Sequence, residues 1–204
     1  MHILKTYTKP HVKVCNMLIL FEGVNAAGKT TLIDYLLPQV PTSVKVSALP
    51  TESWLAKVNS KKYTSFGMFI SLIICRHTYT RKLLKTHPVV FQDRGFISEA
   101  THLPNSRRVD VKIMASFLQK FYPKPNLLIL VDIDPEVAAR RARNREENGG
   151  KPVHANAELE FLTVRRELFL EKFKTSNGAK MCLCGTDPVE VNAGIIMEAV
   201  DYAS

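Results

Sequence analysis

The stretch from Met17 to Leu32, MLILFEGVNAAGKTTL, constrains this chain more than any other. Apolar residues 17–21 lead into a G-x-x-x-x-G-K-T pattern that ends in Lys29 and Thr30, and helix-forming residues follow. A buried strand, a glycine-rich turn and a helix in this order indicate a phosphate-binding loop, because backbone N–H groups and a helix N-terminus then face an anion. The stretch therefore predicts a nucleoside triphosphate site.

Each part of this loop has an expected task. Lys29 brings a mobile positive charge to the β- and γ-phosphates, and the Thr30 hydroxyl can bind Mg²⁺. Glu22, at the end of the preceding strand, is expected near the same magnesium shell. The residues expected to cradle the triphosphate are Gly23, Asn25, Ala26, Ala27, Gly28, Lys29, Thr30 and Thr31. ATP and Mg²⁺ are the cofactors that this loop implies.

Length and composition indicate one domain with a full core, since the chain has 204 residues and 46% of them are hydrophobic. Residues 1–14 form a basic extension, and residues 15–204 form the expected single domain. No apolar run approaches the roughly 18–20 residues of a membrane span. Cys182 and Cys184 lie in an apolar run without metal-ligand spacing, so burial is expected for both. This cysteine usage suits the reducing cytoplasm, with mitochondrion and nucleus left open.

The formal net charge of +9 admits a nucleic-acid surface or a site for phosphorylated small molecules. Four arginines between residues 140 and 145 favour the second, because they crowd the end of one expected helix. The neighbouring stretch 146–157 contains two adjacent glycines and a proline, which is typical of a mobile flap. We therefore expect a lid over residues 141–157 that brings arginines to the phosphates and excludes water. Nucleic acid is not an expected partner.

Apolar runs alternate with helical patterns, which favours a parallel sheet covered by helices. Strands are expected over residues 17–22, 44–48, 89–92, 127–131 and 181–184. Helices are expected from the loop to Pro38, over residues 63–85, 110–121, 135–145 and 158–173, and after a capping box at Asp187-Pro188 with Glu190. Asp134 is the expected N-cap of the fourth helix, with Pro135 at its first position.

Asp93 and Arg94 follow directly on the apolar residues 89–91. The carboxyl end of a parallel strand faces the ligand crevice of an α/β sheet. A carboxylate in that place can hold Mg²⁺, and an arginine beside it can grip a phosphate with two hydrogen bonds. Arg76, on the expected helix 63–85, is as compatible with an ordinary surface position as with a site.

Dispersed motifs resemble the thymidylate kinase family of nucleoside monophosphate kinases. Residues 21–31, FEGVNAAGKTT, are similar to the family's FEG-x-[DE]-x-x-GKTT opening. Residues 93–100, DRGFISEA, resemble DR[YH]-x-x-S-x-x-A, and residues 132–145 are close to the family's lid entrance. The resemblance implies that Asp93 and Arg94 act with Lys29 in catalysis. Because residues 24–27 contain no basic side chain, it also implies that Arg141, Arg143 and Arg145 supply the catalytic lid arginine.

The same resemblance implies an acceptor site that departs from the family pattern. Asn25 stands where the family has an acidic residue, and Leu72 replaces a phenylalanine that stacks on the base, a role that Phe69 can take. Residues 48–50 read Ala-Leu-Pro in place of Arg-Glu-Pro, and His102 stands near an expected glutamine. The implied acceptor residues are Asn25, Phe69, Leu72, Arg76, Arg94 and Ser98.

The resemblance implies a P-loop α/β fold with three layers, a five-stranded parallel sheet of order 2-3-1-4-5, a short lid, and a homodimer formed through helices. The implied reaction transfers the γ-phosphate of ATP to a nucleoside monophosphate, with dTMP to dTDP as the leading choice. Another or a modified deoxynucleotide, or a modified base in DNA, is the alternative acceptor. An ATPase or switch associated with nucleic acid is the alternative of another class. The loop after residue 184 is expected to contact the adenine.

Overall fold

The computed structural model describes residues 16–46, 66–101, 120, 122–149 and 158–200, without the side chains of 66–73 and 99–101. The strands are β1 (Met17–Glu22), β2 (Ser43–Val46), β3 (Val89–Asp93), β4 (Leu127–Asp132) and β5 (Lys180–Cys184). The helices are α1 (Lys29–Leu36), η1 (Leu37–Gln39), α3 (Phe66–Leu84), α4 (Phe96–Thr101), α6 (Pro135–Glu147), α7 (Leu159–Thr175) and α8 (Val189–Ala199). Residues 1–14, the lid residues 150–157, the acceptor residues 48–50 and 102, and nearly all of the expected helix 110–121 lie outside this description.

The five strands form one parallel sheet in the order β2-β3-β1-β4-β5, which confirms the predicted fold. β1 lies at the centre, with Phe21 paired to Asp93 on one side and to Ile129 on the other. Every residue of β1 is buried, as expected for a strand covered on both faces. This central position brings the carboxyl ends of β1, β3 and β4 to one edge of the sheet.

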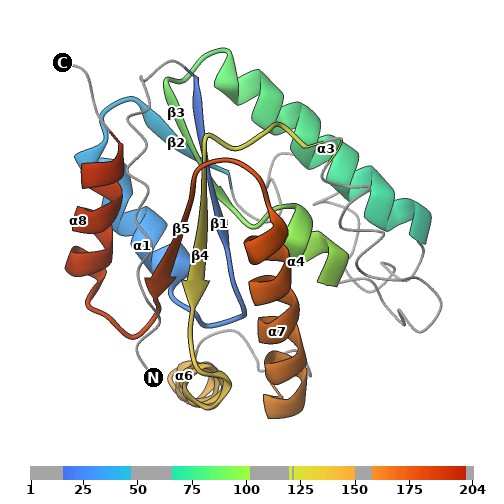
Figure 1. The fold of residues 1–204 in the computed structure, drawn as a ribbon, viewed down its shortest axis with the longest axis vertical. Helices are drawn as coiled ribbons and strands as arrows, with labels where there is room; N and C mark the ends of the chain where they lie inside the picture. Colours follow the sequence, from blue (N-terminus) through green and yellow to red (C-terminus); the bar gives the residue numbers. More distant parts are fainter. Residues whose placement is uncertain (1–15, 47–65, 102–119, 121, 150–157, 201–204) are drawn as a thin grey trace.

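Helices cover both faces of the sheet (Figure 1). α1 and α8 lie on one face and α3, α4 and α7 on the other, whereas α6 lies across the carboxyl ends of β4 and β5. The main apolar core runs from β1 and β4 into α1, α7 and α8. A smaller cluster joins Leu18, Val46 and Val90 to the last turns of α3. The layers leave only the carboxyl edge of the sheet open for a site, since a parallel sheet presents its loops there.

Two local expectations are wrong. Asp187 does not cap the last helix, because α8 begins after Pro188 and its N-cap has no side-chain hydrogen bond. Instead the N–H of Asp187 donates to the Cys184 carbonyl in a turn. Cys182 and Cys184 share one face of β5, as a strand requires, but both are exposed rather than buried. β5 is the last strand of the sheet, so one of its faces is only partly covered.

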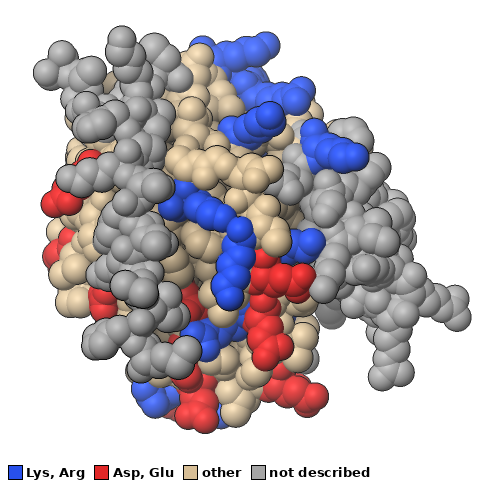
Figure 2. Space-filling model, in the orientation of Figure 1, with Lys and Arg blue, Asp and Glu red and all other residues tan. Residues whose placement is uncertain are grey.

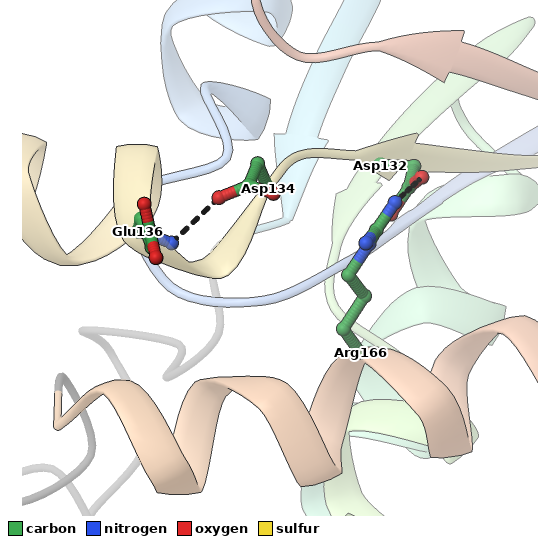
Figure 3. Close-up of polar contacts among 4 residues, drawn as sticks. All are labelled: Asp132, Asp134, Glu136 and Arg166. Carbon is green, nitrogen blue, oxygen red and sulfur yellow. Dashed lines mark hydrogen bonds and ion pairs between the residues drawn. The ribbon is translucent and has the colours of Figure 1, made fainter. Parts of the chain in front are cut away.

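Other local expectations are confirmed to within two or three residues at the element ends. The Asp134 carboxylate accepts a hydrogen bond of 2.8 Å from the Glu136 N–H, which caps α6 as predicted (Figure 3). Pro135 occupies the first helical position, where its missing N–H costs nothing. β2 ends at Val46, short of the predicted residue 48, where the described range stops. In the part of the chain that the structure describes, no helix is long and apolar enough to cross a membrane.

Candidate active site

The phosphate loop occupies residues 23–28, between the end of β1 and the start of α1. Its backbone enters the left-handed region at Ala26, with φ of 60°, and at Gly28, with φ of 98°. Gly23 has φ of 141°, and a Cβ atom there would lie 2.4 Å from the Val131 carbonyl oxygen. Only glycine fits this contact, so the backbone of the loop approaches the end of β4 closely. The exposed first turn of α1 is left free to face an anion, with Thr30 and Thr31 exposed.

Lys29 is folded back onto the loop. Its Nζ donates to the carbonyl oxygens of Gly23 and Val24, at 3.0 and 2.7 Å, and the residue is only 4% exposed. Burial, followed by the positive charge of Arg94, lowers the Lys29 pKa to about 7, against opposition from Asp93 and Glu22. A bound triphosphate would offer this amine an anionic partner in place of two neutral carbonyls.

Thr30 and Asp93 meet across the loop. The Thr30 hydroxyl donates to Asp93 Oδ2 at 2.7 Å, and the other carboxylate oxygen, Oδ1, is buried without a hydrogen-bond partner among the described residues. A hydroxyl and an unsatisfied carboxylate oxygen are the hard oxygen ligands that Mg²⁺ takes beside phosphate oxygens. These two residues therefore fit the predicted magnesium site.

Arg94 turns away from β3 in a conformation that side chains rarely adopt, with φ of 76°. Its N–H donates to the Phe21 carbonyl at 2.9 Å, and its carbonyl accepts from the Gln92 side chain at 3.0 Å. The guanidinium donates to Asn25 Oδ1 at 2.6 Å, so this side chain lies against the phosphate loop. Burial lowers the pKa of Arg94, the carboxylates of Asp93 and Glu22 oppose this shift, and Arg76 adds to it. A guanidinium beside the phosphate loop can bind a phosphate.

Glu22 is fully buried, and both of its oxygens accept hydrogen bonds from the start of α4. The donors are the N–H groups of Gly95, Ile97 and Ser98 and the Ser98 hydroxyl. Burial raises the Glu22 pKa although these hydrogen bonds oppose the shift. Glu22 and Ser98 thus hold α4 against β1. A share of Glu22 in the magnesium shell and of Ser98 in substrate binding stay predictions.

The other predicted acceptor arginine, Arg76, lies on the inner side of α3. Arg76 is only 7% exposed and is close enough to Arg94 to lower the pKa of that residue. The ordinary surface position that the sequence left open is therefore wrong. Phe69 and Leu72 lie on the same helix one to two turns before Arg76, but their side chains are outside the described part. Their contact with a base stays a prediction.

Arg165 belongs to the stretch LEFLTVRREL, whose spacing after the lid fits the family, but no site role was predicted for it, and the structure buries it. It is the largest fully buried side chain among the described residues, at 2% exposure on α7. Burial lowers its pKa to about 10, with Arg94 adding to the shift and Glu22 opposing it. Its burial could have been inferred from its place on the same helical face as Phe161 and Phe169, four residues away on either side.

The lid arginines lie on α6, at the carboxyl ends of β4 and β5, and Arg141, Arg143 and Arg145 are all exposed. Arg141 donates to the Gly185 carbonyl at 2.8 Å, which joins α6 to the loop expected to contact the adenine. After the lid, Arg166 on α7 pairs with Asp132 at the end of β4 (Figure 3). This pair fixes the helix that returns from the lid, and the choice of catalytic lid arginine stays a prediction.

Positive charge also gathers away from the site. Figure 2 shows lysine and arginine side chains over the end of the molecule where α3 finishes, and acidic side chains lower on the same face. Arg81 and Lys82 belong to this last turn of α3, and Lys172 and Lys174 to the last turn of α7. These residues lie at the amino ends of the strands, opposite the phosphate loop, so they do not contribute to its site.

Comparison with known proteins decides the family. The sequence profile described as thymidylate kinase matches residues 21–195, which include every described site residue. The chain belongs to the thymidylate kinase family. The probable thymidylate kinase of Archaeoglobus fulgidus is 32% identical over 166 residues, which cover 76% of this chain and 81% of that protein. The thymidylate kinase of Sulfurihydrogenibium is 26% identical over 201 residues, covering 87% and 94%.

Solved structures agree on the fold. The thymidylate kinase of Candida albicans superposes with a TM-score of 0.66 at 16% identity, over 89% of each chain. A deoxyadenosine kinase from M. mycoides superposes with a TM-score of 0.65 at 15% identity, over 89% of this chain and 97% of that one. With its family relatives, this P-loop fold makes the chain a nucleoside monophosphate kinase, and ATP is its phosphate donor.

Proposed function

We propose that this thymidylate kinase family member phosphorylates dTMP to dTDP. The observation that carries this proposal is the proximity of two arginines, the buried Arg76 and the partly buried Arg94, on the side of the phosphate loop where Asn25 lies. Guanidinium groups suit the oxygens of a monophosphate. The donor phosphates occupy the loop, so the arginines place the acceptor phosphate beside the group to be transferred.

The chain's own residues divide the work. Lys29 leaves the carbonyls of residues 23 and 24 and binds the β- and γ-phosphates, while Thr30 and Asp93 hold Mg²⁺. Magnesium, when bound, neutralises charge on the triphosphate oxygens. Arg94 and Arg76 orient the acceptor phosphate. A general base is not needed, because a phosphate oxygen is already a nucleophile once its charge is shielded.

The lid completes the site. Residues 141–157 close over the phosphates, and Arg143 or Arg145 neutralises the transferred group, since Arg141 is engaged with Gly185. Phe69 and Leu72 face the base. A homodimer through α3, a cytoplasmic location and independence from nucleic acid complete the proposal. The exposed Ile74 on α3, at 59% exposure, supports an apolar contact there.

One assay separates the acceptors. Purified protein with ATP and Mg²⁺ is incubated with a panel of nucleoside monophosphates, nucleosides and duplex DNA, and the products are resolved by chromatography. We expect dTDP as the main product. If only another or a modified deoxynucleotide yields a diphosphate, that nucleotide and not dTMP is the acceptor. If phosphate is transferred to the DNA, the acceptor is a modified base in DNA. ATP hydrolysis without any phosphorylated acceptor would contradict a kinase and favour the switch alternative.

A further inference from the structure

Gln92 is a buried polar residue near the end of β3. Its side chain is 0% exposed and lies on the same face of the strand as Val90, which packs against the last turns of α3. Thr80 on α3 is buried as well, at 1% exposure, and its hydroxyl donates to Gln92 Oε1 at 2.9 Å. Apolar side chains of similar size could fill both places at little cost in stability. The pair therefore invites a role beyond packing.

The hydrogen bond between Thr80 and Gln92 fixes where α3 lies along β3. The helix runs antiparallel to the strand, because it packs on β3 and leads into it through residues 85–88. Arg76 lies four residues before Thr80, about 6 Å along the helix, and Arg94 lies two residues after Gln92, about 7 Å along the strand direction. This register places the buried Arg76 level with Arg94 at the carboxyl edge of the sheet.

The amide nitrogen of the same glutamine holds the turn at Arg94. Gln92 Nε2 donates to the Arg94 carbonyl at 3.0 Å, while the Arg94 N–H donates to the Phe21 carbonyl at 2.9 Å. The φ of 76° at Arg94 is one that side chains rarely adopt, and it persists only where surrounding contacts hold it. From this turn the guanidinium reaches Asn25 Oδ1 at 2.6 Å. Gln92 therefore helps to direct Arg94 toward the phosphate loop.

We propose that Gln92, together with Thr80, is a positioning residue for the acceptor phosphate, because its amide sets the distance between the guanidinium groups of Arg76 and Arg94. This inference rests on the proposed function, in which the two arginines bind that phosphate. Two guanidinium groups on different elements grip one phosphate well only at a fixed separation, since each must reach its own oxygen atoms. One oxygen of the Gln92 amide fixes α3, and its nitrogen fixes the turn at Arg94.

The test compares Thr80→Val, Thr80→Ser and Gln92→Met. Valine keeps the shape of threonine without the hydroxyl, serine keeps the hydroxyl, and methionine has about the length of glutamine without its polar groups. We expect the KM for dTMP to rise about 3- to 10-fold in Thr80→Val and about 10- to 100-fold in Gln92→Met, for one and two lost hydrogen bonds. Thr80→Ser should stay within about twofold of wild type, as should the KM for ATP in all three variants.

A double-mutant cycle separates positioning from stability. If Thr80 acts by placing Arg76, Thr80→Val should raise the dTMP KM much less in an Arg76→Met background than in wild type. The same rise in both backgrounds would overturn the inference. Ile196→Val on α8, a buried residue on the opposite face of the sheet, is the matched control for a modest loss of stability. It should lower the melting temperature and leave both KM values unchanged.

A purely structural role predicts a different pattern. Lower melting temperatures in Thr80→Val and Gln92→Met with an unchanged dTMP KM would overturn the inference and leave the proposed function intact. Should Gln92→Met fail to fold, Thr80→Val decides, because it removes a single hydroxyl. Wild type that phosphorylates another monophosphate would refute dTMP as the acceptor, and the variants are then compared on that monophosphate. Wild type that phosphorylates no monophosphate would refute the proposed function and the inference together.

Discussion

The guanidinium of Arg166 donates two parallel hydrogen bonds to the carboxylate of Asp132, with Nε 2.7 Å from Oδ1 and Nη2 2.8 Å from Oδ2. Arg166 lies on α7 and Asp132 ends β4, so the pair spans 34 residues and closes the chain segment that contains α6 and the lid residues. The side chains are 31% and 12% exposed. With this geometry, a partly buried pair contributes more to the free energy of unfolding than an ordinary surface ion pair does.

A double-mutant cycle measures this pair. We expect Arg166→Met and Asp132→Asn each to lower the free energy of unfolding, with a coupling of about 1–3 kcal/mol, because both hydrogen bonds involve charged groups. Urea denaturation of the two single variants and the double variant gives the coupling. Additive losses would mean that the two side chains stabilise α7 independently.

Two substitutions of Glu22 separate the contribution of its charge to stability from that of its hydrogen bonds. Glu22→Gln retains a carbonyl acceptor for α4, whereas Glu22→Ala leaves buried N–H groups of residues 95, 97 and 98 unsatisfied. We expect alanine to cost about 2–4 kcal/mol and glutamine clearly less. Unfolding in urea at one neutral pH compares the two variants with wild type. Equal losses would show that the contacts with α4 need the charge itself.

The pH dependence of the glutamine variant has a definite sign. The Glu22 pKa is raised in the folded protein, so its contribution to stability is fully present below the ordinary pKa of 4.5 and is lost as pH rises through the folded value. The stability of Glu22→Gln relative to wild type should therefore increase with pH above 4.5. A flat difference between pH 4.5 and 8 would contradict the raised pKa.

The lowered pKa of Lys29 predicts that the protein takes up a proton when it binds a nucleotide. In the free protein its pKa is lowered to about 7 from an ordinary value of 10.5, and triphosphate oxygens favour the charged form. At pH 8 we expect ATP binding to take up nearly one proton, and at pH 6 almost none. Calorimetric titrations in buffers of different ionisation enthalpy measure the uptake. Identical heats in all buffers at pH 8 would refute the lowered pKa.

The lowered pKa of Lys29 also determines how the free energy of unfolding changes with pH. The unfolded chain keeps the Lys29 proton up to about pH 10.5 while the folded chain releases it near 7, so the Lys29 contribution to stability rises with pH between these values. Lys29→Met should lack this slope. It should also lose turnover by at least about 10³-fold, since the side chain that neutralises the phosphates is gone.

Lys180 provides a structural prediction away from the site. Its Nζ donates to the carbonyl oxygens of Phe173, Lys174 and Ser176 at the end of α7, at 3.0, 2.8 and 3.0 Å. Lys180→Met leaves these carbonyls without their cation, so we expect a loss of about 1–3 kcal/mol in unfolding free energy. The KM values for ATP and dTMP should stay unchanged. A raised dTMP KM would mean that this end of α7 controls the acceptor site.

Some of the site followed from local patterns. The phosphate loop, Asp93 and Arg94 were predicted because a strand that ends in a glycine-rich turn, or in a charged pair, places those residues at one edge of a parallel sheet. Arg76 could not be decided, because one helix pattern does not reveal which element covers it. Cys182 and Cys184 were predicted to be buried because free cysteines usually are; the expected strand order placed their strand at an edge of the sheet, but it does not say how far helices cover the faces of that strand.

By itself, the sequence determined the order of the strands and of most helices along the chain, though not the short α4, and the phosphate loop, since each depends on neighbours within a few positions. Tertiary structure alone decided the partners over long separations, such as Glu22 with α4 and Arg166 with Asp132. The physical reason is that charge burial depends on which helices pack together. The sequence does not show whether an arginine side chain is exposed to water or is buried beside another charged group.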